Sequence, residues 1–172
     1  MALTKIIGSG IGTVTNQFAD ANMASGSILQ IVNTQVQTNQ SISSSSYTGM
    51  SNYNTAITPS STSSKILIHY GYHVFIANHT SGAWRALGIR LMRVTGDTVL
   101  ITDGSDYGLG ANHDHATDRY MAFASSSFLD SPSTTSATTY GLEGKSTAGI
   151  SLDVNNPSYA KGGFMTLYEI AG

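Results

Sequence analysis

The stretch PSSTSSKILIHYGYHVF, residues 59–75, decides the fold class of this chain. A turn rich in Ser and Thr leads directly into a segment in which large apolar side chains recur at every second position. The same join returns in DSPSTTSATTYGL, residues 130–142. Because hydroxyl-rich turns and a period of two both favour strands joined by reversals, the sequence predicts an antiparallel β structure.

Alternating segments continue along most of the chain after residue 26. The expected strands are residues 28–32, 53–58, 65–76, 84–94, 98–102, 119–129, 138–144 and 164–170. Polar stretches separate them, and no amphipathic helix is predicted to serve as a crossover between parallel strands. The sequence therefore predicts an all-β fold, an antiparallel β-sandwich of the jelly-roll type, in residues 27–172.

Composition limits the function classes. The 172 residues suit one domain, and a charged fraction of 10% with a net charge of -2 gives no basic field for nucleic acid. The chain has no cysteine, which excludes disulfides, thiolate metal sites and a thiol nucleophile. The first apolar stretch is short and interrupted by glycines, so we expect a soluble, unsecreted protein without membrane insertion.

Residues 1–26 show no sustained period and are expected to form an N-terminal arm. The arm carries more apolar side chains than a free linker should. These are Leu3, Ile6, Ile7, Ile11, Val14 and Phe18. We expect them to dock either on the chain's own domain or on a larger partner.

Two strands are apolar on both faces. In residues 65–76 the core face is expected to hold the even positions, from Ile66 to Ile76, and the other face the odd ones. The last strand repeats this pattern. The residues expected on the second, non-core face are Leu67, His69, His73 and Phe75, with Phe164, Tyr168 and Ile170. A subunit partner is the expected cover, and a loop or the arm is the alternative.

His69 and His73 lie on that second face four residues apart. At about 3.3 Å per residue their α-carbons stand about 13 Å apart, too far for one metal ion. If they lie in an apolar contact between subunits, assembly should weaken below about pH 6 as they gain charge.

Several segments resemble small virion proteins of marine tailed phages, including cyanophages. They are MALTKIIG (1–8), ITPSSTSSKILI (57–68), FLDSPSTTSATTY (128–140) and MTLYEI (165–170). The resemblance implies a homotrimeric jelly roll like the C1q and tumour-necrosis-factor domains, located in the virion and assembled in the host cytoplasm. It also implies that the arm attaches the protein to other virion proteins of the head or tail. No catalytic residue carries over from it.

The densest polar stretch, residues 103–118, is expected to be a long loop that contacts a receptor such as a host-surface glycan. The expected contact residues are Asp103, Asp106, Tyr107, Asn112, His113, Asp114, His115 and Asp118. His113 and His115 around a threefold axis are one candidate metal site, and the four aspartates are a candidate calcium site. A polar turn without metal is the favoured interpretation, and we expect no cofactor.

No catalytic motif stands out. The chain lacks a Gly-x-Ser-x-Gly elbow, and its glycines at 8, 10 and 12 do not follow a strand. The sequence therefore predicts a non-enzymatic structural protein, a homotrimeric tail fibre or surface projection that takes part in host adsorption. A head-decoration protein and a lectin-like glycan-binding module are the alternatives, with a depolymerase as a more distant one.

Overall fold

The computed structural model describes residues 23–76, 85–102, 112–113, 120–146, 151–156, 158 and 162–172, with only the backbone at 85, 112, 113 and 120. These residues form eleven strands and no helix. In chain order the strands are β1 (Ile28–Val36), β2 (Gln40–Ile42), β3 (Thr48–Ile57), β4 (Lys65–Ile76), β5 (Arg85–Arg93), β6 (Thr98–Ile101), β7 (Asn112–His113), β8 (Tyr120–Asp130), β9 (Thr138–Ser146), β10 (Leu152–Val154) and β11 (Gly163–Ile170).

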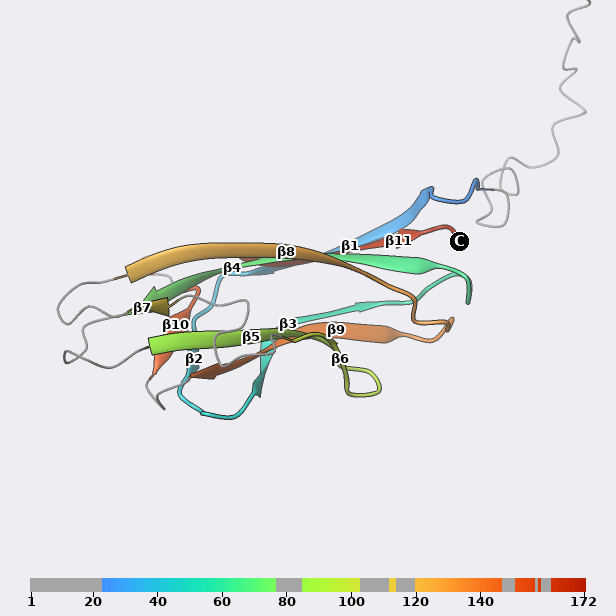
Figure 1. Ribbon diagram of the computed structural model, residues 1–172. Helices are drawn as coiled ribbons and strands as arrows, with labels where there is room; N and C mark the ends of the chain where they lie inside the picture. Colours follow the sequence, from blue (N-terminus) through green and yellow to red (C-terminus); the bar gives the residue numbers. More distant parts are fainter. Residues whose placement is uncertain are drawn as a thin grey trace, which may run out of the picture.

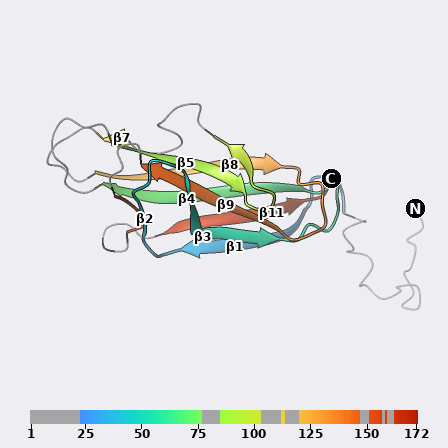
Figure 2. The same cartoon turned by 90° about the horizontal axis from the view of Figure 1, so that it is seen from below.

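The strands form two antiparallel sheets that face each other (Figures 1 and 2). In sheet A the strands β1, β11, β4 and β8 lie side by side. Beyond the end of β11 at Gly163, the short β10 pairs with β4 in its place, and β2 pairs with β10. Sheet B has the order β3-β9-β5-β6, and β7 pairs with the start of β5. The chain changes sheet at most of its connections. The predicted antiparallel β-sandwich is confirmed, and the jelly-roll assignment stays a prediction.

All eight expected strands are present. The structure adds β2, β7 and β10, which have two or three residues each, and it begins β3 at Thr48 rather than at Tyr53. A register shift between Met50 and Thr55 interrupts the pairing of β3 with β9. The early part of β3 was missed because such an irregularity breaks the alternation from which strands are read.

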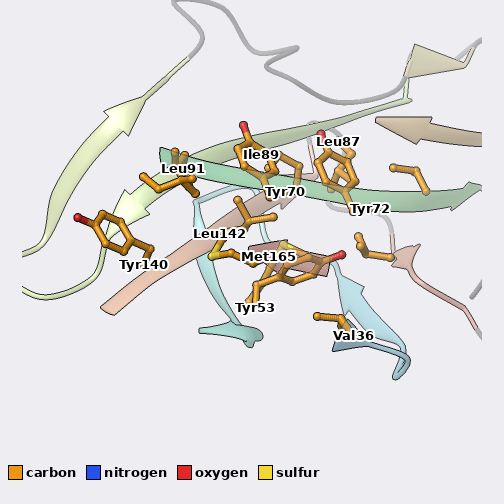
Figure 3. Packing of buried hydrophobic residues seen from close by; sticks show 14 of the residues in the cluster. Val36, Tyr53, Tyr70, Tyr72, Leu87, Ile89, Leu91, Tyr140, Leu142 and Met165 are labelled. Carbon is orange, nitrogen blue, oxygen red and sulfur yellow. The ribbon is translucent and has the colours of Figure 1, made fainter. Parts of the chain in front are cut away.

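The core lies between the sheets and is rich in tyrosine (Figure 3). Every even position of β4 from Ile66 to Ile76 is at most 1% exposed, which confirms the predicted core face. Across from it, β5 and β9 contribute Leu87, Ile89, Leu91, Tyr140 and Leu142. Each such side chain contributes about 1.5–3 kcal/mol on burial, so this layer holds the two sheets together.

A buried carboxylate accepts hydrogen bonds from each of the two turn-to-strand joins. Glu169 of β11 accepts hydrogen bonds from Ser60 and Ser64 in the turn before β4. Asp130, at the end of β8, accepts one from the Tyr140 hydroxyl at 2.8 Å and forms an ion pair with Arg93. The turns that identify the fold in sequence are thus anchored by charge-assisted hydrogen bonds.

Candidate interaction surface

The side of sheet A that faces away from sheet B, called here the outer face, is the candidate functional surface. Because side chains alternate along a strand, its members follow from the core assignment and the strand register. They are Ile28, Ile31, Asn33 and Gln35 of β1; Ser41 of β2; Phe164, Thr166, Tyr168 and Ile170 of β11; Lys65, Leu67, His69, Gly71, His73 and Phe75 of β4; Met121, Phe123, Ser125, Ser127 and Leu129 of β8; and Asp153 of β10.

One row of this face is apolar from edge to edge. Register places Ile31 opposite Tyr168, Tyr168 opposite Leu67, and Leu67 opposite Leu129. Ile31 is 58% exposed and Leu129 48% exposed at the two edges, while the central two are half-buried. Four adjacent apolar side chains, exposed at both edges of the sheet, form a patch of the kind that marks a contact with a partner.

A second apolar cluster surrounds Gly71. A Cβ at Gly71 would lie 2.7 Å from a ring carbon of Phe123 and 2.7 Å from one of Phe164, so the two rings close over the bare backbone. His69 packs edge-on against Phe164 with ring centroids 5.0 Å apart, and His73 lies 4.8 Å from Phe123. Glycine at 71 therefore permits a continuous aromatic strip across the outer face.

The residues expected at a subunit contact all lie on the outer face. Leu67, His69 and His73 are half-buried, as are Phe164, Tyr168 and Ile170 of β11. Phe75 is only 4% exposed, so the chain itself already covers it. The apolar surface also includes five exposed residues that the sequence reasoning missed, namely Ile28, Ile31, Met121, Phe123 and Leu129. No alternation in the sequence marks these residues, because β8 also has a large side chain, Phe128, on its core-facing side.

The two outward surfaces of the sandwich differ in charge. Between Lys65 at one end of the outer face and Asp153 at the other, its described residues carry no Lys, Arg, Asp or Glu. On sheet B, by contrast, Arg90 pairs with Glu143 and lies 4.4 Å from the Tyr47 ring centroid, which Lys145 also approaches. Sheet B presents a solvated, charged surface, and sheet A presents one suited to contact.

A serine and a histidine meet on the outer face, and their geometry is structural. His69 Nε2 lies 3.1 Å from Ser125 Oγ, while the Ser125 hydroxyl donates to the Tyr70 carbonyl oxygen at 3.0 Å. The serine hydroxyl therefore donates its proton to a backbone carbonyl and not to His69. Among the described residues no carboxylate contacts His69 to orient it, which a nucleophilic triad requires.

Most of the predicted receptor loop lies outside the described residues. This applies to Asp103, Asp106, Tyr107, Asp114, His115 and Asp118. Asn112 and His113 form β7, whose backbone pairs with Ala86 and Arg85 of β5. The arm residues Leu3, Ile6, Ile7, Ile11, Val14 and Phe18 also lie outside the described part.

Neither a cluster of metal-ligating side chains nor a membrane-spanning helix occurs in the described part of the chain. Within these residues no group of three or more His, Cys, Asp or Glu side chains is placed to hold a metal ion. The same residues include no helix long and apolar enough to span a bilayer.

Comparisons with known proteins give a likeness among solved structures only. No protein-family model matches the chain, and no curated protein matches it. The crystal structure of the infectious bursal disease virus VP2 subviral particle aligns with 83% of this chain at 16% identity and a TM-score of 0.42. The T=1 particles derived from that virus give 15% identity and a TM-score of 0.43 over 83% of this chain. The chain spans 37% and 36% of the length of these two chains.

Proposed function

We propose that the protein is a non-enzymatic structural component of a tailed-phage virion, and that it works as a homotrimer joined through the outer face of sheet A. The exposed apolar row and aromatic strip of that face carry the proposal, because a lone domain has no second interior to cover them. The resemblance of the turn segments to marine phage virion proteins supports the virion setting.

The proposal includes an orientation of the protein in the particle. In the proposed trimer the outer faces of sheet A turn toward each other, and the charged surface of sheet B faces solvent. Residues 1–26 attach the trimer to a head or tail protein, and the loop at residues 103–118 meets the receptor, for which a host-surface glycan is the expected chemistry. A fibre that takes part in host adsorption fits this arrangement.

Light scattering coupled to gel filtration tests the trimer. We expect three times the chain mass of 18.1 kDa for the unmodified protein. Phe123→Asp should weaken self-association at least about tenfold, because it places an unpaired charge in the contact, yet leave folding intact at a site that is 52% exposed. The matched control is Val99→Asp at the edge of sheet B, where the side chain is 39% exposed. A monomeric parent protein would overturn the proposal.

Location is tested on the particle itself. Electron microscopy of virions labelled with an antibody against this chain should mark tail fibres or other projections. Label spread evenly over the head would replace the fibre with head decoration and leave the trimer untouched. Particles without any label would remove the virion assignment.

A further inference from the structure

We propose that copies of this chain pack edge to edge around a closed ring, with the β8 edge of one outer face contacting the β1 edge of the next. Leu129 of one copy meets Ile31 of its neighbour, beside the hollow at Gln35. The inference rests on the proposed homotrimer and specifies how its subunits contact one another.

Symmetry requires two different patches. A twofold dimer joins one patch to itself, but a ring of three joins a patch on each copy to a different patch on the next. Rotation about an axis that runs along the strands keeps every residue at the same height on that axis. The two patches must therefore lie at opposite edges of the outer face and at matching heights.

The strand register meets both conditions. Ile31 and Leu129 occupy the two ends of a single row, Ile31-Tyr168-Leu67-Leu129, and both are about half exposed. Two rows further along β4, Gln35 and Phe164 share a row with Gly71. Phe123 lies opposite His73, which is two residues further along β4 than Gly71. Leu129 at one edge thus finds a counterpart, Ile31, at the same height on the other.

The β1 edge also has space for side chains of a neighbour. A hollow of about 350 Å³ opens there, and its lining includes Asn33, Gln35, Gln37, Phe164 and Thr166. Asn33 donates a hydrogen bond to the Thr166 hydroxyl at 2.7 Å, which holds one wall in place. The ring of Phe123 lies over Gly71 of its own chain, so the aromatic strip is part of each copy and Leu129 is the side chain exposed at the β8 edge.

Charge points to a second copy as the occupant. The outer face has Lys65 and Asp153 at its two ends and no Lys, Arg, Asp or Glu among its described residues between them. Copies related by a ring therefore meet without like charges in contact, whereas a strongly charged partner would find no complementary charge there.

Disulfide trapping tests the contact, and the absence of cysteine from the chain keeps the background clean. The double variant Ile31→Cys with Leu129→Cys should form covalent dimers and trimers, and no larger species, when oxidised at low protein concentration. Within one copy the two positions are three strand spacings apart, about 14 Å. A disulfide requires about 4.4–6.8 Å between α-carbons, so each bond must join two chains.

The single variants are the controls. In the proposed ring, Ile31→Cys alone and Leu129→Cys alone stay uncross-linked, and an equal mixture of the two yields dimers. Covalent dimers from either single variant would show a patch that contacts itself and would overturn the inference. A trimer by light scattering whose double variant does not cross-link would also overturn it while leaving the homotrimer standing. A monomeric parent protein would remove both.

Discussion

The backbone amide and the hydroxyl of Ser60 both donate hydrogen bonds to one carboxylate oxygen of Glu169, each at 2.7 Å. The Ser64 hydroxyl donates to the same oxygen at 2.7 Å, and Gln30 donates to the other oxygen. Glu169 is fully buried, and uncharged donors alone hold its charge. The turn before β4 is thus fixed to the last strand of the chain.

Replacing this carboxylate should destabilise the fold. Glu169→Gln keeps the shape of the side chain but turns an amide N–H₂ toward donors that need an acceptor. Hydrogen bonds to a charged group contribute about 1.5–3 kcal/mol each, and a buried group left unpaired costs a similar amount. We expect the free energy of unfolding, from urea denaturation, to fall by about 2–4 kcal/mol.

Glu143 provides the matched control. The same Glu→Gln substitution can be made at Glu143 on the surface of sheet B, where the ion pair with Arg90 is partly exposed. Exposed pairs contribute about 0–1 kcal/mol, so Glu143→Gln should change little. Equal losses in the two variants would contradict an anchoring role for Glu169.

Stability should fall in acid because of the same group. Burial alone would raise the pKa of Glu169, but hydrogen bonds from Ser60, Gln30 and Ser64 outweigh it and hold the pKa below the ordinary 4.5. A lowered pKa in the fold stabilises it above the unfolded pKa, and that contribution is lost as pH falls through the folded pKa.

The measurement is the urea midpoint between about pH 7 and about pH 3. The parent protein should lose stability below about pH 4.5, and the difference between it and Glu169→Gln should shrink there. The pKa of Asp153 is also lowered, because hydrogen bonds outweigh its partial burial. Asp153 is present in both proteins, so its contribution to the pH dependence cancels in the difference between them. A difference that stays constant down to pH 3 would contradict this account.

The faces of β4 could be predicted from sequence, but those of β8 could not. Every even position of β4 is large and apolar, and all are buried. On β8 Met121, Phe123 and Leu129 point outward, while Ala122, Ala124 and Phe128 pack against the core. The usual expectation that the more apolar face is inside fails there, because pairing with β4 decides which way each residue points.

The remaining differences also have physical causes. β2 and β10 have three residues each, too few for a period to show, and they pair across more than a hundred residues of sequence. Glu169 gives no sign of burial in sequence, since a glutamate near the end of a strand normally faces water. Only the approach of a turn over a hundred residues away makes its burial favourable.

Asn155 lies between the end of β10 and the start of β11 and hydrogen-bonds to the neighbouring strands there, so its removal should destabilise the fold. Its side chain accepts a hydrogen bond from the His73 amide at 3.0 Å and donates one to the Tyr53 hydroxyl at 2.6 Å. Asn155→Ala leaves the His73 amide without its acceptor and removes one of the two hydrogen bonds of the buried Tyr53 hydroxyl, which still donates to the Gly71 carbonyl oxygen. It also places alanine at a φ of 56°. We expect a loss of about 2–4 kcal/mol in the free energy of unfolding.

Asn155→Gly separates the two causes. Glycine adopts positive φ freely, so this variant loses the hydrogen bonds without the backbone strain. It should be more stable than Asn155→Ala by about 1 kcal/mol and remain well below the parent protein. If both variants match the parent protein in denaturation midpoint, the side chain of Asn155 does not hold the sheet together.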